Sequence, residues 1–469
     1  MQLTQSDNTH NLSSVDASST ICALATPAGG AIAVIRLSGN DAINIADKVF
    51  VSKSNHRLIE AKPQTLHFGH LTNQDGEVID EVLVSIFRSP HSYTGENAVE
   101  ISCHGSQYVI SQILKTFIQN GCRQANPGEY TQRAFMNGKM DLSQAEAVAD
   151  LIASTNRATH QMAMSQLKGH FSDELALLRN QLLKITSLLE LELDFSDHEE
   201  LEFADRTELL DLAQTIDQRL YTLAHSFETG KAYKQGVAVA IVGKTNVGKS
   251  TLLNQLLKEE KAIVSNIHGT TRDVIEDTTE IKGVTFRFID TAGIRSTNDE
   301  IERLGIERTY KKLSEARIIL WLVDEQPNRS EIQEMLEYCE DKQVILVQNK
   351  IDIRTIPNTL PTNNLSTIQI SAKLGTNIGQ LENLLYQKAN IPEITENDVI
   401  ITSARHYDAL IHAKESITRV INGLKADLSG DLIAEDLRVC LDQLADITGG
   451  QITTPEVLEN IFKHFCIGK

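Results

Sequence analysis

The chain has 469 residues, 41% hydrophobic and 23% charged, as expected of a globular protein with roughly two to four domains. Its 44 basic and 63 acidic residues give a net charge of −19, which argues against nonspecific nucleic-acid binding over the whole surface, since phosphate contacts need Lys and Arg. No apolar run is long enough to predict a membrane-spanning helix. The 6 cysteines lack C-x-x-C spacing, which favours a reducing cytoplasm over a disulfide framework or a zinc site.

The first half of the chain contains three segments that differ in composition and hydrophobic pattern. Residues 1–18 are polar and lack the regions of a signal peptide, so we expect a short disordered extension. Residues 19–138 mix short β-type runs with Gly and Pro turns, an α+β pattern. Residues 139–235 are almost free of Gly and Pro and predict helices. One apolar stripe within them, at 4-3-4-3-4 spacing, predicts the core face of a long helix: Phe171, Leu175, Leu178, Leu182, Ile185 and Leu189.

The second half begins with short apolar strands that alternate with helices. The runs V-A-V-A-I-V, V-T-F-R-F-I, I-I-L-W-L-V, Q-V-I-L-V and I-Q-I predict strands covered on both faces, as in a doubly wound sheet. After Pro392 we expect helix to the end of the chain. The simplest organisation is an α/β domain over 236–389, inserted into a helical domain whose halves are 139–235 and 390–469.

A phosphate-binding loop follows the first of these strands. G-K-T-N-V-G-K-S, residues 243–250, matches G-x-x-x-x-G-K-S between a predicted strand and a predicted helix. In such a loop the backbone N–H groups and Lys249 hold phosphates, and Ser250 offers its hydroxyl to Mg²⁺. The residues expected to contact nucleotide here are Asn246, Val247, Gly248, Lys249, Ser250 and Thr251.

Further motifs follow in the order of a GTP-binding domain. G-T-T-R-D lies where a switch loop would place Thr271 on Mg²⁺, and D-T-A-G follows the second strand. N-K-I-D suits guanine, because the Asp352 carboxylate can accept from the ring N1–H and the exocyclic amine. S-A-K follows the last strand, where a base-edge loop belongs. These motifs supply Gly269, Thr270, Thr271, Asp290, Thr291, Ala292, Gly293, Asn349, Lys350, Asp352, Ser371, Ala372 and Lys373.

Two features stay open when the residues are considered alone. Many GTPases orient water with a Gln directly after D-x-x-G, but Ile294 stands there, and the carboxylates that follow (Glu300, Glu302 and Glu307) are equivalent candidates. The chain ends in H-F-C-I-G-K. A prenylation signal fits this tail poorly, and a frayed helix end with a buried thiol is the alternative.

The chain resembles the MnmE (TrmE) family of tRNA-modification GTPases over nearly its whole length. The resemblance rests on A-T-P-A-G-G-A-I-A-V-I-R-L-S-G, S-Y-T-G-E-N-A-V-E-I-S-C-H-G, P-G-E-Y-T-Q-R-A-F-M-N-G-K-M-D-L-S-Q-A-E-A-V-A-D-L-I, the GTPase motifs, D-E-I-E-R-L-G-I-E-R and F-C-I-G-K. It implies an α+β N-terminal folate-binding domain that also dimerises, a discontinuous all-α helical domain and an inserted α/β P-loop G domain. It further implies a homodimer whose G domains meet during hydrolysis.

The resemblance also implies a reaction and its partners. With the FAD-dependent partner MnmG, in a heterotetramer or larger complex, the family installs an aminomethyl or carboxymethylaminomethyl group at C5 of the tRNA wobble uridine. The one-carbon unit comes from 5-formyl- or methylene-tetrahydrofolate, and FAD enters only through the partner. If MnmG supplies much of the positive surface for tRNA, the acidic charge of this chain is consistent with this role.

The resemblance assigns residues to the GTPase reaction. Glu302 matches the family's catalytic glutamate, which orients water in place of the missing Gln. K⁺ supplies positive charge where other GTPases receive an arginine finger. Its matched ligands are Asn246, Ser265, Ile267 (through the backbone carbonyl) and Thr270, and the same stretch adds Asn266 and His268 to the nucleotide contacts. Thr245 stands where the family often has Pro, which alters the stiffness of the loop and leaves Asn246 in place.

The resemblance also assigns a folate site. The matched contacts are Arg36, Glu100, Lys139 and Lys469, with Arg and Lys suited to carboxylates or a polar ring edge and Glu100 to an aminopyrimidine. Without the resemblance, a paired edge charge is an equal interpretation of Glu100. Cys466 is a proposed participant in the chemistry, on a tail that folds back across a dimer.

Two other functions compete with this assignment. One is a regulatory GTPase that docks on assembling ribosomes and has no folate role. The other is a folate-dependent methyltransferase with an accessory G domain, which would turn over folate without GTP. A G domain does not define its downstream task. The N-terminal motifs and the F-C-I-G-K tail favour the tRNA-modifying enzyme over both.

Overall fold

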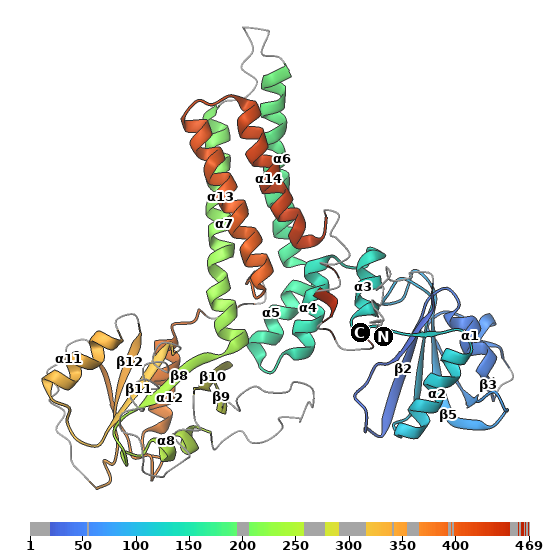
Figure 1. Cartoon of the computed structure of the whole chain (residues 1–469), viewed down its shortest axis with the longest axis horizontal. Coiled ribbons are helices and arrows are strands. Elements are labelled where there is room, and N and C mark those ends of the chain that lie inside the picture. Colours follow the sequence, from blue (N-terminus) through green and yellow to red (C-terminus); the bar gives the residue numbers. More distant parts are fainter. Residues whose placement is uncertain are drawn as a thin grey trace, which may run out of the picture. The chain divides into compact units, whose positions relative to one another are not determined.

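The computed structural model describes residues 19–53, 56–194, 206–257, 277–289, 316–339, 342–353, 365–392, 395, 398–450, 458, 461–463, 465 and 468. The chain divides into two compact units. Figure 1 labels their helices and strands. The first comprises Met1–Ile152, Gln166–Leu210 and Arg419–Lys469, and the second comprises Ala153–Ser165 and Asp211–Thr418. The domain boundaries predicted from the sequence are finer than this division and stay predictions.

A seven-stranded sheet dominates the start of the first unit, in the order β3-β4-β5-β6-β2-β1-β7. Neighbouring strands are antiparallel except β1 and β7, which are parallel. The elements are β1 (Ile21–Leu24), β2 (Ile32–Ser38), α1 (Ala42–Val49), β3 (Phe50–Ser52), η1 (Leu58–Glu60), β4 (Thr65–Thr72), β5 (Val78–Phe87), β6 (Ala98–His104), α2 (Gln107–Gln119) and β7 (Arg123–Gln124).

The two faces of this sheet differ in character. Helices α1 and α2 cover one face over an apolar core that includes Ile35, Ile101 and Phe117. Directly opposed residues on antiparallel strands share a face. The register therefore places Arg36, Glu100 and the partly exposed Phe68 and Leu83 together on the other face. The predicted α+β N-terminal domain is confirmed.

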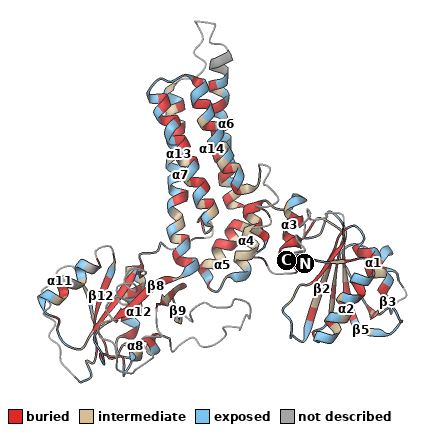
Figure 2. Ribbon diagram, viewed as in Figure 1, coloured by how far each residue is buried: buried red, intermediate tan, exposed pale blue. Residues whose placement is uncertain are grey.

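Helices complete the first unit: α3 (Glu129–Met136), α4 (Leu142–Ala153), α6 (His170–Asp194) and α14 (Gly430–Thr448). Helix α6 carries the predicted apolar stripe and packs against α14 (Figure 2). No stripe residue is more than 3% exposed: Phe171, Leu175, Leu178, Leu182, Ile185 and Leu189. The stripe is therefore a core face, as its spacing predicted.

The second unit contains a six-stranded sheet in the order β13-β12-β11-β8-β10-β9, parallel except for β9. Apolar clusters cover both faces, one including Leu252 of α8 and Leu381 of α12, the other Ile332 of α11. The predicted doubly wound arrangement is confirmed. Its elements are β8 (Val237–Val242), α8 (Lys249–Leu256), β9 (Asp277–Ile281), β10 (Val284–Phe288), β11 (Ile318–Val323), α11 (Arg329–Tyr338), β12 (Gln343–Gln348), β13 (Ser366–Gln369) and α12 (Ile378–Ala389).

Helices that flank this sheet in sequence also belong mostly to the second unit: α5 (Arg157–Leu167), α7 (Arg206–Gln235) and α13 (Ala404–Lys425). Phe227 of α7 stacks on Tyr407 of α13 with 4.6 Å between ring centroids. The segments on either side of the inserted α/β domain therefore meet, as a discontinuous helical domain requires. Within the described residues, no helix is both long and apolar enough to cross a membrane.

The expectation of continuous helix after Pro392 is wrong for residues 398–403, which are neither helix nor strand. Ile401 is buried in this segment, and its N–H donates to Ser226 Oγ at 3.0 Å. A Cβ on Gly230 of α7 would come within 2.1 Å of the Ile401 carbonyl oxygen. The missing side chain lets the non-helical segment lie directly on α7.

Candidate functional site

The phosphate-binding loop joins β8 to α8 and depends on two glycines. Gly243 has φ +153°, and a Cβ there would lie 2.2 Å from the carbonyl oxygen of Leu322. Gly248 has φ +100°, and a Cβ there would lie 2.4 Å from Nδ2 of Asn349. Side chains are excluded at both positions by neighbouring strand ends. The loop is therefore packed tightly against the carboxyl edge of the sheet, where doubly wound proteins bind ligands.

Lys249 folds back over this loop. Its Nζ donates to the carbonyl oxygens of Gly243 and Lys244, each at 2.8 Å. The ammonium charge thus lies against the loop that leads into the N-terminus of α8, an arrangement that attracts phosphate. Ser250 and Asn246, which has φ +61°, supply hydroxyl and carboxamide oxygens. Such hard donors fit Mg²⁺ and K⁺.

Asn349 connects three of the predicted motifs. The side chain is buried, its Nδ2 donates to the carbonyl oxygen of Val247 at 2.8 Å, and its Oδ1 accepts from the Ala372 N–H at 2.9 Å. Ser371 Oγ donates to Oδ1 of Asp352 at 2.7 Å. One hydrogen-bonded frame therefore joins the phosphate loop, N-K-I-D and S-A-K, and it holds the exposed Asp352 where a base edge could be met.

Lys350 has φ +67°, and its Nζ donates to Oδ2 of Asp324 at 2.7 Å. Asp324 follows β11 directly and belongs to none of the predicted motifs. An Asp at the end of a strand is common and is not a specific signal in a sequence. The role of Asp324 therefore becomes visible only through its ion pair with Lys350.

Many of the predicted site residues lie outside the described residues. These are Ser265, Asn266, Ile267, His268, Gly269, Thr270, Thr271, Asp290, Thr291, Ala292, Gly293, Glu302, Cys466 and Lys469.

A second cluster lies on the open face of the N-terminal sheet. Arg36 of β2 and Glu100 of β6 are directly opposed in register. Arg36 donates from Nε at 2.9 Å and from Nη2 at 2.6 Å, both to Oε1 of Glu100. The two side chains are 19% and 31% exposed. The structure thus brings two of the four predicted folate contacts together as a half-buried ion pair that a ligand can reach.

Lys139 lies near the loop between β5 and β6. Its Nζ donates to the carbonyl oxygen of Pro90 at 3.1 Å, and Asn137 Nδ2 donates to that of Thr94 at 2.7 Å. The segment that follows α3 therefore holds the loop at two points.

Two tyrosines that are not among the predicted site residues complete this cluster. The guanidinium carbon of Arg36 lies 5.7 Å from the ring centroids of both Tyr93 and Tyr130. The Tyr130 hydroxyl donates to the carbonyl oxygen of Arg36 at 2.7 Å, and burial raises its pKa well above the ordinary value. Both tyrosines stand in stretches that carried the family resemblance, S-Y-T-G-E and P-G-E-Y-T, which was the available signal.

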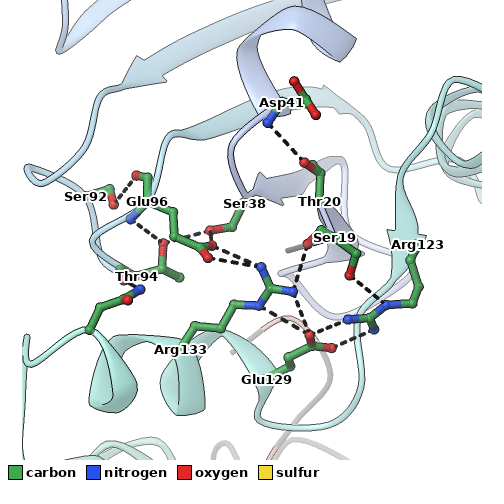
Figure 3. Close-up of polar contacts among 11 residues, drawn as sticks. Ser19, Thr20, Ser38, Asp41, Ser92, Thr94, Glu96, Arg123, Glu129 and Arg133 are labelled. Carbon is green, nitrogen blue, oxygen red and sulfur yellow. Dashed lines mark hydrogen bonds and ion pairs between the residues drawn. The ribbon is translucent and has the colours of Figure 1, made fainter. Parts of the chain in front are cut away.

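An ion-pair network anchors the first turn of α3 (Figure 3). Glu129, fully buried, accepts from Arg123 at 2.6 Å and from Arg133 at 3.0 Å, and Arg133 also pairs with Glu96 at 3.1 Å. We call these four residues the α3 ion-pair network. Burial alone would raise the pKa of Glu129, but hydrogen bonds from Arg123 and the Asn126 N–H, with both Arg charges, lower it. The carboxylate therefore stays ionised and fixes α3 to β7.

The C-terminal tail reaches the same region. Phe462 and Phe465 pack against Leu142 of α4, and a Cβ on Gly128, just before α3, would lie 2.7 Å from the Phe462 carbonyl oxygen. The Gly468 carbonyl oxygen lies 3.4 Å from Nη1 of Arg36. This contact lies within one chain, and the expectation that the tail crosses a dimer stays a prediction.

Comparisons with known proteins agree with this arrangement. Residues 20–139 match the family model for the GTP-binding protein TrmE N-terminus, and residues 142–466 match the MnmE helical domain. A tRNA modification GTPase MnmE from Parabacteroides distasonis is 56% identical over 461 residues, covering 96% of this chain and 100% of that protein. One from Bacteroides thetaiotaomicron is 55% identical over 464 residues, covering 96% and 99%.

Among solved structures, the G domain of the T. maritima FeoB iron transporter covers 33% of this chain and 99% of its own length. Its identity is 24% and its TM-score 0.24, too low to support a functional argument. The two family models and the full-length relatives carry the assignment. The chain belongs to the MnmE family of tRNA modification GTPases.

Proposed function

We propose that this chain is the GTP-hydrolysing component of wobble-uridine modification. With the FAD-dependent partner MnmG, in a heterotetramer or larger complex, it installs an aminomethyl or carboxymethylaminomethyl group at C5 of the tRNA wobble uridine. Membership of a family of tRNA modification GTPases supports GTP hydrolysis and action on tRNA. The observation that carries the finer proposal is the half-buried Arg36–Glu100 pair, reached by the tail at Gly468, in a chain that also has a GTPase domain.

In the G domain, we assign phosphate binding to the loop from Asn246 to Thr251, and base recognition to N-K-I-D and S-A-K. The bonds from Asn349 to both loops support this assignment, because they fix the distance between phosphate and base contacts. GTP brings Mg²⁺, for which Ser250 and Thr271 are the proposed ligands. Glu302 is the proposed water-orienting residue.

We assign K⁺ to Asn246, Ser265, Ile267 and Thr270. The ion would supply positive charge to the transferring phosphoryl group, which in other GTPases comes from an arginine finger. The left-handed backbone of Asn246 supports this role, because an Asn tolerates that conformation while it offers a carboxamide oxygen.

For the folate, we assign Arg36, Glu100, Lys139 and Lys469 as contacts. A tetrahydrofolate derivative would supply the one-carbon unit. Both bonds from Arg36 reach Oε1 of Glu100, and among the described residues Oε2 accepts no hydrogen bond. Glu100 can therefore accept from an aminopyrimidine without losing Arg36. Cys466, two residues before Gly468, is the proposed participant in the chemistry.

We also propose a homodimer built through the N-terminal domains. The open face of the sheet presents Leu66, Phe68 and Leu83, which are 62%, 45% and 41% exposed on neighbouring strands. A second copy of this chain would bury that apolar face, which a monomer leaves in water. The reducing cytoplasm stays our proposed compartment, and none of the five described cysteines forms a disulfide.

Mass spectrometry of wobble nucleosides tests the proposal. Cells that lack this gene would be rescued with the full chain or with a chain that ends at Phe465. We expect only the full chain to restore the C5-substituted uridine. Restoration by both would remove Cys466 and Lys469 from the site. Restoration by neither, with good expression, would favour the alternative of a regulatory GTPase in ribosome assembly.

A further inference from the structure

Tyr93 occupies an unusual position in the loop between β5 and β6. Its hydroxyl lies 2.8 Å from Oγ1 of the fully buried Thr131, yet the residue remains 37% exposed. Burial raises the pKa of Tyr93, against the hydrogen bond with Thr131 and the Arg36 charge, which lower it. The polar end of the side chain is thus anchored in protein while part of the ring is open to solvent beside Arg36.

Three consecutive residues in the first turn of α3 reach three parts of this region. Glu129 holds the α3 ion-pair network. Tyr130 donates to the Arg36 carbonyl oxygen at 2.7 Å, and Thr131 bonds the Tyr93 hydroxyl at 2.8 Å. A single helical turn, fixed by a buried carboxylate between two guanidinium groups, therefore sets the positions of both Arg36 and Tyr93.

The loop that carries Tyr93 is also held from its other side. Asn137 Nδ2 donates to the Thr94 carbonyl oxygen and Lys139 Nζ to that of Pro90, at 2.7 and 3.1 Å. Bonds on both sides of Tyr93 restrict the ring before any ligand arrives. A partly exposed aromatic ring that is held in this way loses little conformational entropy on binding, which is how preorganised sites gain affinity.

We propose that Tyr93 provides the face on which a planar heteroaromatic ligand stacks beside the Arg36–Glu100 pair, and that the first turn of α3 positions it. The ligand class is a pteridine or similar fused aminopyrimidine. Its ring would stack on Tyr93 while its N–H edge donates to Oε2 of Glu100. This inference rests on the proposed folate function and adds Tyr93 as a contact and Thr131 as a positioning residue.

Calorimetric titration of the full chain with 5-formyl-tetrahydrofolate tests the stacking contact. We expect Tyr93→Leu to weaken binding about tenfold or more, since it removes the stacking ring. Tyr108→Leu, a matched change at a 71% exposed tyrosine of α2, should bind as the wild type does. Binding of a GTP analogue should be unchanged in both variants.

Two further variants test positioning. Tyr93→Phe keeps the ring and loses its tether, and Thr131→Val loses the same tether from the other side. Each should weaken binding by a smaller factor than Tyr93→Leu does. The double variant should weaken binding no more than either single variant, because all three lack the same hydrogen bond. Additive losses would contradict the positioning role of Thr131.

A spectroscopic readout separates stacking from a structural effect. The chain has 1 tryptophan, Trp321, which is buried in the G domain. Added 5-formyl-tetrahydrofolate should quench the new fluorescence of Tyr93→Trp much more than that of Tyr108→Trp. Equal quenching, or wild-type affinity in Tyr93→Leu while Arg36→Ala loses binding, would overturn this inference alone. A wild-type chain that binds the GTP analogue and no 5-formyl-tetrahydrofolate would overturn the folate proposal together with it.

Discussion

Asn349 donates a hydrogen bond from Nδ2 to the carbonyl oxygen of Val247 at 2.8 Å, so the proposed base-recognition motif directly supports the proposed phosphate-binding loop. The contact joins residues 102 positions apart in the chain. The Asn349 carboxamide and its two backbone partners are buried. Removing the carboxamide therefore leaves the Val247 carbonyl oxygen and the Ala372 N–H without this partner. Each such loss costs about 1–3 kcal/mol.

The first prediction concerns this contact. Asn349→Ala should weaken GDP and GTP binding at least about tenfold, since it loosens both loops that we assign to nucleotide binding. Asn349→Asp, which keeps the acceptor for Ala372, should lose less. Fluorescent-nucleotide titration measures both. Equal affinities for the wild type and Asn349→Ala would show that the two loops are positioned independently.

Glu302→Gln should leave GTP affinity unchanged and lower the hydrolysis rate about 100-fold or more, because the amide orients and accepts from the attacking water poorly. Single-turnover hydrolysis with excess enzyme isolates this step. The matched control is Glu300→Gln, which changes a neighbouring carboxylate. A comparable loss in the control would remove the special role of Glu302.

Asn246→Ala should abolish stimulation of GTP hydrolysis by K⁺. The wild type should hydrolyse GTP faster in KCl than in NaCl at equal ionic strength, and the variant should show no difference. Rates at saturating GTP keep any change in affinity out of the comparison. A variant that retains the K⁺ response would place the ion on other ligands.

Glu129 should make the stability of the N-terminal domain depend on pH. Its pKa is lowered in the folded state, so its stabilisation is fully present above the unfolded pKa of about 4.3 and is lost progressively as pH falls from there through the lower folded pKa. Glu129→Gln should cost about 3 kcal/mol near neutral pH and flatten this acid dependence, because the buried Arg133 and the partly exposed Arg123 lose the carboxylate that they share. Urea unfolding across pH measures both. An unchanged acid profile would mean that other carboxylates dominate.

Phe68→Glu should convert the proposed homodimer to a monomer, since it places a charge in the apolar open face of the sheet. Light scattering during size-exclusion chromatography gives the mass. Tyr108→Glu on α2, at the helix-covered side of the sheet, is the control and should stay dimeric. Dimers in both variants would place the interface elsewhere.

The strands and helix faces that depend on local hydrophobic pattern could be predicted from the sequence. V-A-V-A-I-V reads as a strand because both of its faces are buried, and the stripe on α6 follows from helical spacing. Strand β9, D-T-T-E-I, escaped detection because it is an edge strand with alternating exposure and few apolar residues. The predicted I-Q-I strand in fact spans Ser366–Gln369, one residue short of the buried Ile370.

The sequence predicts which residues belong to the candidate sites. It predicts less well which of their side chains contact one another. The pairing of Arg36 with Glu100 follows from the register of two strands 64 residues apart, which no local signal encodes. The roles of Tyr130 and Thr131 depend on how α3 packs on the sheet. Motifs therefore supply the chemical groups, and long-range packing decides which of them meet.

A labelled one-carbon unit tests most directly whether GTP hydrolysis by this chain drives wobble-uridine modification. The full chain would be combined with FAD-loaded MnmG, unmodified tRNA, methylene-tetrahydrofolate with a ¹³C one-carbon unit, and ammonium or glycine as the amine donor. Parallel reactions would contain GTP or a non-hydrolysable analogue. Mass spectrometry would then measure the mass of the wobble nucleoside. We expect the label in the C5 substituent with GTP, no label with the analogue, and no label when the chain carries Arg36→Ala. An unlabelled C5 substituent, or one formed equally well without GTP hydrolysis, would contradict the proposed function.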